Sequence, residues 1–329
     1  MMRPRLPVSA RFAPLLVGCA CAALLFASIA ATRAPSQPQP AALAAPAADQ
    51  EPITPIPQPS AADPLKLALG ERLFDDGRLS ASGSLACSSC HDLHTNGAGG
   101  NGRNVAQNGS RPFDTPTIFN AALSFRLNWE GNFRTLAGQA RASIESPDNG
   151  MHSSVADVVR RLKADPGISK QFDVAYGHGP DQDSFFDALV TFERSLLTPG
   201  SRFDRWLSGD TSALGADELE GYRLFKSYGC SSCHQGVNVG GNLFERQGVF
   251  RQLVKGPPKI VRVPSLRNVA ATAPYFHDGS AATLEDAVRR MAAAQLDRTL
   301  SDQQVESVVA FLKTLTGNYR GKPVTGHTP

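Results

Sequence analysis

The sequence carries two copies of one five-residue motif, C-S-S-C-H, at residues 87–91 and 230–234. The pattern C-x-x-C-H is the attachment signature of c-type haem, in which two cysteines form thioethers and the histidine binds iron. A zinc site needs four closed ligands and a redox dithiol needs no following histidine, so both alternatives fit less well. The motifs predict two covalently bound haem c groups. Their attachment residues are Cys87, Cys90, Cys230 and Cys233, and their iron ligands are His91 and His234.

The first 34 residues have the features of an export signal. Arg3, Arg5 and Arg11 precede an apolar stretch over residues 12–31. A basic leader followed by an apolar segment predicts a signal peptide at residues 1–34 and, after its cleavage, a location in the periplasm. Membrane anchoring by the uncleaved stretch is a less favoured alternative. Lipid attachment at Cys19 is disfavoured because the apolar stretch continues past this residue.

Cysteine usage and charge narrow the function classes. The chain has six cysteines, and those outside the two motifs, Cys19 and Cys21, lie in the leader, so the mature protein is expected to have no disulfide. The formal charge is +3, and removing the four leader arginines leaves about −1. This balance gives no support to a nucleic-acid partner, whereas electron-transfer partners use local patches rather than net charge.

Composition and repetition divide the chain into segments. Residues 35–62 are rich in Pro and Ala and predict an extended spacer, and Asp63-Pro64 predicts a helix start. Similar pentapeptides, Gly70–Phe74 and Gly221–Phe225, precede the two motifs. The sequence therefore predicts a mostly α-helical fold of two tandem cytochrome c-like haem domains. Their ranges are 63–210 for the N-terminal domain, carrying the reactive haem, and 211–329 for the C-terminal electron-transfer domain.

Apolar periodicity and capping residues place several helices. Helical patterns cover Val155–Leu162, Phe185–Leu197 and Phe203–Leu207, and a further helix begins near Ala216. Two more helices are predicted to begin with capping boxes or a close variant, formed by Thr283 with Asp286 and Ser301 with Gln304.

The sixth iron ligands decide whether each haem carries electrons or reacts. An electron-transfer haem keeps six ligands, whereas a catalytic haem needs an open position. Met291 is the candidate sixth ligand of the second haem. No clear candidate serves the first haem, because His94 is too close to His91, and Met151 and His152 are the remaining options. The sequence thus predicts one closed and one open haem.

Several further segments resemble the bacterial dihaem cytochrome c peroxidases, the superfamily that includes MauG. The resemblance covers roughly residues 52–317. Its motifs are Leu73–Ser80, Thr115–Ala121, Trp129–Gly131, Pro264–Asn268 and Thr272–Gly279.

The resemblance implies roles for individual residues. Met291 takes the place of the sixth ligand of the electron-transfer haem; MauG itself has a tyrosine there, so Met291 favours the peroxidase branch. Trp129 matches the tryptophan that assists electron transfer between the haems. Asp114 takes the place of an asparagine that helps bind a calcium ion between the haems, and Thr272 and Pro274 match its carbonyl ligands. Oxygen ligands suit calcium, and a solvated turn is the alternative for Asp114.

Two departures from the family pattern bear on the chemistry. Ala106 stands where many members have a histidine that blocks the reactive haem until reduction, so the first haem is expected to be open without activation. The position of the family's catalytic glutamate corresponds to the neighbourhood of Asp148 and Asn149 in this sequence. Glu145 is a further alternative for the same role. Peroxide must lose one proton and its distal oxygen must gain one, so an acid is better suited than Asn149.

These expectations combine into one predicted activity, a periplasmic dihaem peroxidase that reduces hydrogen peroxide to water. Electrons would come from a small c-type cytochrome or cupredoxin, enter at the second haem and pass by Trp129 to the first. A homodimer is a further expectation from the resemblance. The alternatives are a MauG-like enzyme that oxidises residues of a partner protein and a non-catalytic carrier with two six-coordinate haems.

Overall fold

A computed structural model describes residues 50–99, 113–147, 151–253 and 259–326 of the chain. These residues are mainly helical, which confirms the predicted class, and the strands are short. The N-terminal helices are α1 (Pro64–Phe74), α2 (Leu136–Glu145), α3 (Val155–Lys163), α4 (Pro166–Tyr176) and α5 (Gln182–Ser195). The C-terminal helices are α6 (Arg202–Leu207), α7 (Ala216–Ser227), α8 (Leu284–Leu296) and α9 (Asp302–Lys313).

Most predicted helix starts are confirmed by their caps. The Asp63 carboxylate accepts from the backbone N–H groups of Leu65 and Lys66 at the start of α1. Ser301 and Gln304 form the reciprocal capping box of α9. Thr283 accepts from the Asp286 N–H at the start of α8, although no bond in the reverse direction is formed.

Helices α2 and α4 lie outside the predicted set. Each has a capping residue, Thr135 for α2 and Asp165 for α4, and Pro166 occupies the first turn of α4. Their apolar residues are few, because α2 buries only Ala140 and Ile144. An apolar stripe that is too weak to be recognised from the sequence can therefore still belong to a helix, because tertiary packing supplies the stabilising contacts.

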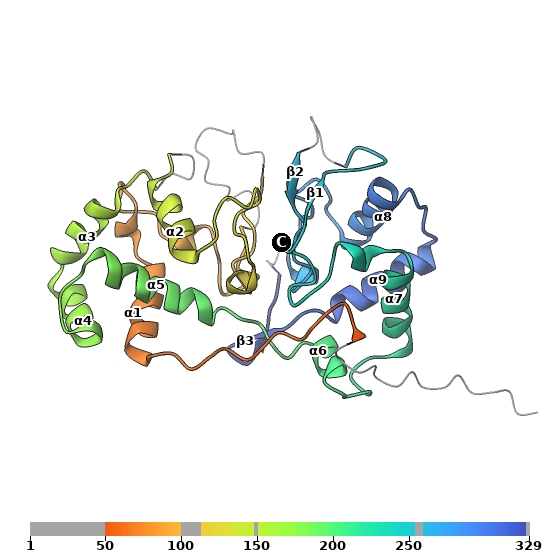
Figure 1. Cartoon of the computed structure of the whole chain (residues 1–329), viewed down its shortest axis with the longest axis horizontal. Helices are drawn as coiled ribbons and strands as arrows, with labels where there is room; N and C mark the ends of the chain where they lie inside the picture. Colours follow the sequence, from red (N-terminus) through yellow and green to blue (C-terminus); the bar gives the residue numbers. More distant parts are fainter. Residues whose placement is uncertain (1–49, 100–112, 148–150, 254–258, 327–329) are drawn as a thin grey trace, which may run out of the picture. The chain divides into compact units, whose positions relative to one another are not determined.

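The strands form two small antiparallel pairs. Phe244–Arg246 (β1) pairs with Ile260–Arg262 (β2), and Asn318–Tyr319 (β3) pairs with Lys322–Pro323 (β4). Figure 1 shows β1 beside β2. Isolated bridges also close two tight loops, Leu127 with Phe133 and Tyr275 with Ala281.

The repeated pentapeptides are explained by helix crossings. A side chain on Gly70 of α1 would collide with the Ala188 carbonyl of α5, and one on Gly221 of α7 would collide with the Ser307 carbonyl of α9. Glycine at each position therefore lets two helix backbones approach closely. The crossings α1–α5 and α7–α9 are the equivalent frameworks of the two repeats.

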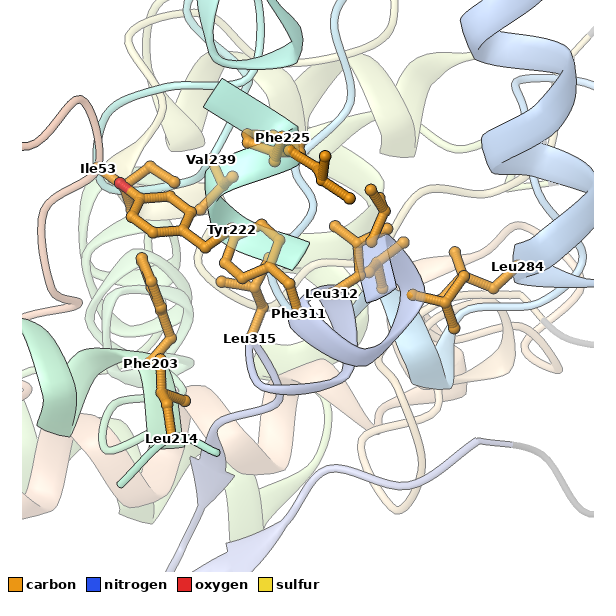
Figure 2. Close-up of a cluster of buried hydrophobic side chains, with 14 of the residues drawn as sticks. Ile53, Phe203, Leu214, Tyr222, Phe225, Val239, Leu284, Phe311, Leu312 and Leu315 are labelled. Atoms are coloured by element: carbon orange, nitrogen blue, oxygen red, sulfur yellow. The ribbon is translucent and has the colours of Figure 1, made fainter. Parts of the chain in front are cut away.

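Each repeat has its own hydrophobic core. The N-terminal core joins α1, α3, α4 and α5 around Phe74, Phe172 and Phe192. The C-terminal core joins α6, α7 and α9, and Figure 2 shows Phe203, Tyr222 and Phe311 together in it. Their rings meet at centroid distances of 4.8 Å (Phe203–Tyr222) and 4.9 Å (Tyr222–Phe311).

Each core includes a residue from the terminal segment that adjoins the other repeat. Ile53, from the segment predicted as a spacer, is 0% exposed within the C-terminal core. Val324, near the other end of the chain, is buried in the N-terminal core, and the Tyr319 ring contacts Phe119 there at a centroid distance of 4.9 Å, with the two planes tilted by 51°. Part of the predicted spacer thus belongs to a hydrophobic core. The segment before the N-terminal repeat packs in the C-terminal core, and the segment at the end of the C-terminal repeat packs in the N-terminal core.

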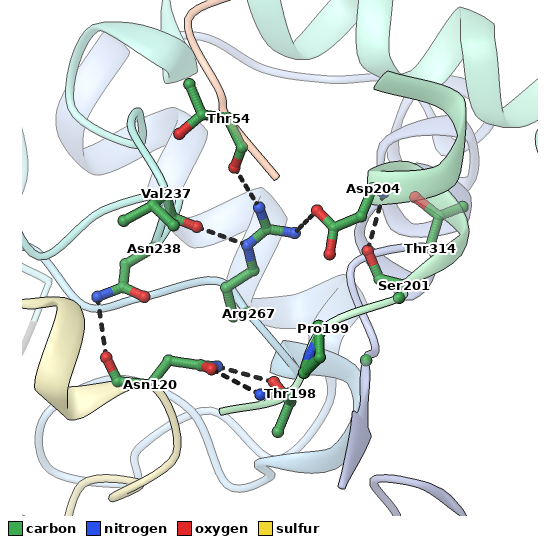
Figure 3. A network of polar contacts seen from close by, with 12 residues as sticks. Thr54, Asn120, Thr198, Pro199, Ser201, Asp204, Val237, Asn238, Arg267 and Thr314 are labelled. Carbon is green, nitrogen blue, oxygen red and sulfur yellow. Dashed lines mark hydrogen bonds and ion pairs between the residues drawn. The ribbon is translucent and has the colours of Figure 1, made fainter. Parts of the chain in front are cut away.

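A buried arginine secures the first of these segments. Arg267 is 1% exposed and forms an ion pair at 2.7 Å with Asp204. It also donates to the carbonyls of Val237 and Thr54, both at 2.8 Å, as Figure 3 shows. A buried guanidinium is tolerated only when its donors are satisfied. Arg267 therefore ties residue 54 to the loop after the second motif.

None of the helices within the described residues is long and apolar enough to cross a lipid bilayer.

Candidate haem sites and the residues between them

The two C-S-S-C-H motifs adopt the same local fold. Each begins with one 3-10 turn, Cys87–Ser89 and Cys230–Ser232. In each motif the histidine N–H donates to the carbonyl of the first cysteine, at 3.0 Å for both His91 and His234. The turn brings the two cysteines of each motif to one side, and none of the four forms a disulfide. This is the arrangement that two thioether bonds to one porphyrin require.

Both histidines are oriented for iron binding. The His91 Nδ1 lies 3.1 Å from the Gly97 carbonyl, and the His234 Nδ1 lies 3.3 Å from the Val239 carbonyl. A carbonyl holds the proton on Nδ1 and leaves Nε2 as the metal-binding atom. Burial lowers the pKa of both rings, that of His234 to about 4, so each imidazole is neutral at pH 7.

A cavity of about 280 Å³ adjoins the second motif. Its lining includes Cys230, Cys233 and His234 of the motif and Met291 of α8. Two buried polar atoms lack a partner there among the described residues, the Arg262 Nε and the His277 Nδ1. An apolar cavity with two cysteines, a neutral histidine and orphaned polar atoms fits a haem group.

Met291, the predicted sixth ligand, lines the same cavity as the second motif. It is half-buried and packs against the small cluster of Leu253 and Ala294. A methionine in a closed core would be purely a packing residue, but this one shares its cavity with His234. The ligand role stays a prediction.

The first motif is described less completely, because Ala106, Asp148 and Asn149 lie outside the described residues. Among the alternatives, Met151 is 6% exposed in the N-terminal core, whereas His94 and His152 are exposed.

The structure also places Glu145, the third candidate for the acid. It ends α2, is exposed, and forms an ion pair with Arg141 at 3.4 Å. The contacts of Glu145 are those of an ordinary surface ion pair.

Four residues from the two repeats form a closed ring of hydrogen bonds. Trp129 Nε1 donates to the Asp114 carbonyl at 2.8 Å, and the Asp114 N–H donates to the His277 carbonyl at 2.7 Å. His277 Nε2 donates to the Arg262 carbonyl at 3.1 Å, and the Arg262 N–H donates to the Trp129 carbonyl at 2.8 Å. The ring joins a loop of the N-terminal repeat to two segments of the C-terminal repeat and fixes the Trp129 indole.

The loops that carry Trp129 and His277 are equivalent. Each spans one isolated bridge, and each has a left-handed residue just before the ring, Asn128 (φ 70°) and Phe276 (φ 70°). Trp129 and His277 meet edge to face with centroids 4.5 Å apart. The sequence holds a signal for this pairing, the aromatic-acid-glycine pattern shared by residues 129–131 and 277–279. The family resemblance implied a role for Trp129 and none for His277 or Arg262.

The residues predicted to bind calcium are brought together in part. Asp114, Thr272 and Pro274 line the same cavity. A side chain on Gly279 would collide with the Asp114 carboxylate and lie 3.1 Å from Pro274 Cγ, so the carboxylate and Pro274 flank this glycine. Among the described residues, no group of three or more acidic, His or Cys side chains is arranged to hold a metal ion. A calcium ion here would therefore depend on backbone carbonyls as well as Asp114.

One buried acid near the first motif was not predicted. Glu193 of α5 is 6% exposed, and its Oε2 has no hydrogen-bond partner among the described residues. Burial raises its pKa to about 8, and its charge contributes to the raised pKa of Cys87. Position 193 lies inside a helical stripe, so periodicity alone gave no reason to separate it from its neighbours.

Two family models match the chain. The di-haem cytochrome c peroxidase family matches residues 64–212, and the cytochrome c family matches residues 219–316. Together with the helical structure, they confirm the prediction of two tandem cytochrome c-like units.

Curated relatives point in the same direction. Cytochrome c551 peroxidase of Nitrosomonas europaea is 38% identical over 288 residues, which covers 82% of this chain and 86% of that protein. The methylamine utilization protein MauG of Methylorubrum extorquens is 34% identical over 287 residues, covering 79% and 81%. Cytochrome c peroxidase Ccp of Escherichia coli is 36% identical over 293 residues, and the match spans 84% of this chain but only 63% of that protein.

A solved structure has a similar fold. The crystal structure of a MauG-like protein associated with microbial copper homeostasis superposes with a TM-score of 0.67 at 27% identity, covering 80% of this chain and 93% of that one.

Proposed function

The chain belongs to the di-haem cytochrome c peroxidase family, and from this premise we propose that it reduces hydrogen peroxide to water with electrons from a small c-type cytochrome or cupredoxin. Each peroxide takes two electrons and two protons and gives two water molecules. The observation that supports this proposal best is the difference between the two motifs. The cavity beside Cys230–His234 also contains Met291, whereas Met151 is packed in the N-terminal core and His152 is exposed.

The C-terminal residues suit electron storage. Covalently attached haem c supplies a redox-active iron at each motif. At the second motif, His234 and Met291 would hold the haem iron, and a histidine–methionine ligand pair raises the reduction potential. With both residues bound to the iron, this site would store electrons rather than bind peroxide.

Trp129 suits the transfer of electrons between the sites. Its indole lines the C-terminal cavity, together with Ala98, Gly99 and Pro116 of the N-terminal repeat. Pro116 in turn offers its carbonyl to the His91 ring. Aromatic and backbone groups therefore connect the surroundings of the second motif with the ligand of the first.

The N-terminal residues suit the reaction with peroxide. His91 would hold the haem iron, and a residue near 145–149 would move the protons of peroxide. We propose Asp148 or Asn149 for this place, with Asp148 favoured because only an acid can carry a proton. Ala106 in place of a blocking histidine would leave this site open in the oxidised protein.

Three further features belong to the proposal. A calcium ion held by Asp114 and the carbonyls of Thr272 and Pro274 would brace the loops between the repeats. The basic and apolar leader supports export to the periplasm, where haem c is attached. A homodimer remains part of the proposal as an expectation from the family.

A MauG-like activity is the second candidate, because one relative carries that name at 34% identity. An enzyme with this activity would use the same pair of haems to oxidise residues of a partner protein. A methionine at position 291, rather than the tyrosine of MauG, favours the peroxidase.

The test compares fully oxidised with pre-reduced haem-loaded protein. Peroxide is added with a reduced c-type cytochrome, and oxidation of that donor is followed by absorbance. Turnover in both forms supports an open first site, and turnover only after pre-reduction refutes it and indicates a blocking ligand such as His152 or Met151. Absence of turnover in both forms would reject the peroxidase, and high-spin ferric absorption would then separate an open site from a six-coordinate carrier.

A further inference from the structure

Arg262 is a half-buried cation without an acidic partner among the described residues. Its Nε is fully buried and makes no hydrogen bond, and its Nη1 lies 3.4 Å from the Ser124 hydroxyl. Burial lowers the pKa of this guanidinium to about 10, so it is still charged at neutral pH. Removing a charge from water is unfavourable unless an ion of opposite charge pairs with it. An anionic ligand next to Arg262 would therefore be favourable.

The hydrogen-bond ring fixes where this cation lies. The Arg262 N–H donates to the Trp129 carbonyl and the Arg262 carbonyl accepts from His277 Nε2, so its backbone is held on both sides. The guanidinium carbon lies 5.8 Å from the centre of the Trp129 ring. Both side chains line the cavity that Cys230, Cys233 and His234 share.

We propose that Arg262 binds a propionate carboxylate of the haem attached to Cys230 and Cys233, and thereby ties this haem to the Trp129 loop. Haem carries two propionates, and a carboxylate matches the two-donor fork of a guanidinium. The inference rests on haem binding in this cavity, and it does not depend on whether peroxide is the substrate.

Another arginine of the same cavity provides a matched control. Arg246 on β1 lines the cavity but its side chain is exposed. Water screens an exposed charge far more than a buried one. Removing either cation changes the formal charge equally, so a specific effect of Arg262 must come from its buried position.

The reduction potential of the C-terminal haem is the first readout. A buried cation disfavours the ferric form, which is the more positive state, so Arg262→Gln should lower the potential. We expect the reduction equilibrium constant to fall about tenfold, which is ~59 mV for a one-electron couple. Arg246→Gln should change it less than about twofold.

Infrared difference spectra on reduction provide the second readout, with carbon-13 in the propionate carboxylates. In Arg262→Gln and in Arg262→Lys the labelled carboxylate bands should shift, because Lys keeps the charge but loses the fork. The potential should fall less in Arg262→Lys than in Arg262→Gln. The Lys variant also keeps the measurement possible where the Gln variant loads haem poorly.

The proposal would be overturned if the labelled carboxylate bands were unchanged in both Arg262 variants. A lowered potential would not rescue it, because the loss of a positive charge alone could lower the potential. Equal potential shifts in the Arg246 and Arg262 variants would also count against it. A protein that fails to turn over peroxide but shows these shifts would reject the proposed activity while retaining the propionate contact.

Discussion

Trp129 and His277 occupy equivalent positions in the two repeats and meet edge to face with ring centroids 4.5 Å apart. Each follows a left-handed residue in a loop closed by one bridge. A pseudo-symmetric pair of loops thus places one aromatic ring from each repeat at their junction. Trp129 is part of the proposed route of electrons, and the His277 ring packs against it.

Trp129→Phe should slow transfer between the haems while leaving the fold intact. Phenylalanine keeps an aromatic ring but loses the Nε1 donor to the Asp114 carbonyl, which should lower stability by about 1 kcal/mol. Peroxide turnover should fall at least about tenfold, roughly 1.4 kcal/mol in activation free energy, at unchanged haem content.

Trp206→Phe is the matched control, because the chain has two tryptophans and Trp206 lies in the C-terminal core, with a buried Nε1 that has no partner among the described residues. Stopped-flow absorbance measures both variants. Equal losses of turnover would contradict a special role for Trp129.

Gly70→Ala and Gly221→Ala should each destabilise the protein. The added methyl group would collide with the Ala188 or Ser307 carbonyl at a helix crossing, and overpacking of this kind costs about 1–3 kcal/mol. Gly167→Ala, on the exposed first turn of α4, should be neutral or slightly stabilising. Denaturant unfolding measures all three, and tolerance of alanine at both crossings would show that the backbones can separate.

Arg267→Met should cost about 3–5 kcal/mol, because it leaves the Asp204 carboxylate buried without its cation. The double variant Arg267→Met, Asp204→Asn should recover part of this loss, since no buried charge remains. The recovery, measured as a coupling energy in denaturant unfolding, separates the ion pair from the contacts with Thr54 and Val237. Strict additivity of the two substitutions would argue that the pair contributes nothing specific.

Glu193 should make stability fall as pH rises. Its pKa is raised from the ordinary glutamate range to about 8, so the unfolded chain releases this proton near pH 4.5 while the folded protein retains it. Between these values stability should decrease with pH, by at most about 4–5 kcal/mol for this group.

Glu193→Gln removes the ionisable group and should flatten this part of the profile. The difference between the variant and the parent should grow from pH 5 to pH 8, measured by thermal unfolding of the haem-loaded proteins. A constant difference across that range would mean that Glu193 is ionised in the fold.

Much of this structure could be predicted from local sequence patterns. The haem motifs, the caps of α1 and α9 and the repeated pentapeptides are short and depend on near neighbours. The contributions of Ile53 and Val324 to opposite cores could not, because each depends on contacts far along the chain. Arg262 was missed for the same reason, since its burial and its missing acid partner are properties of the folded cavity.

The proposed activity is tested most directly by the stoichiometry of peroxide reduction. Haem-loaded protein is mixed with a limiting amount of hydrogen peroxide and an excess of reduced c-type cytochrome, and both reactants are quantified. The proposal predicts catalytic turnover with two donor cytochromes oxidised for each peroxide consumed. Peroxide loss without donor oxidation, or no loss above the haem-free control, would contradict it.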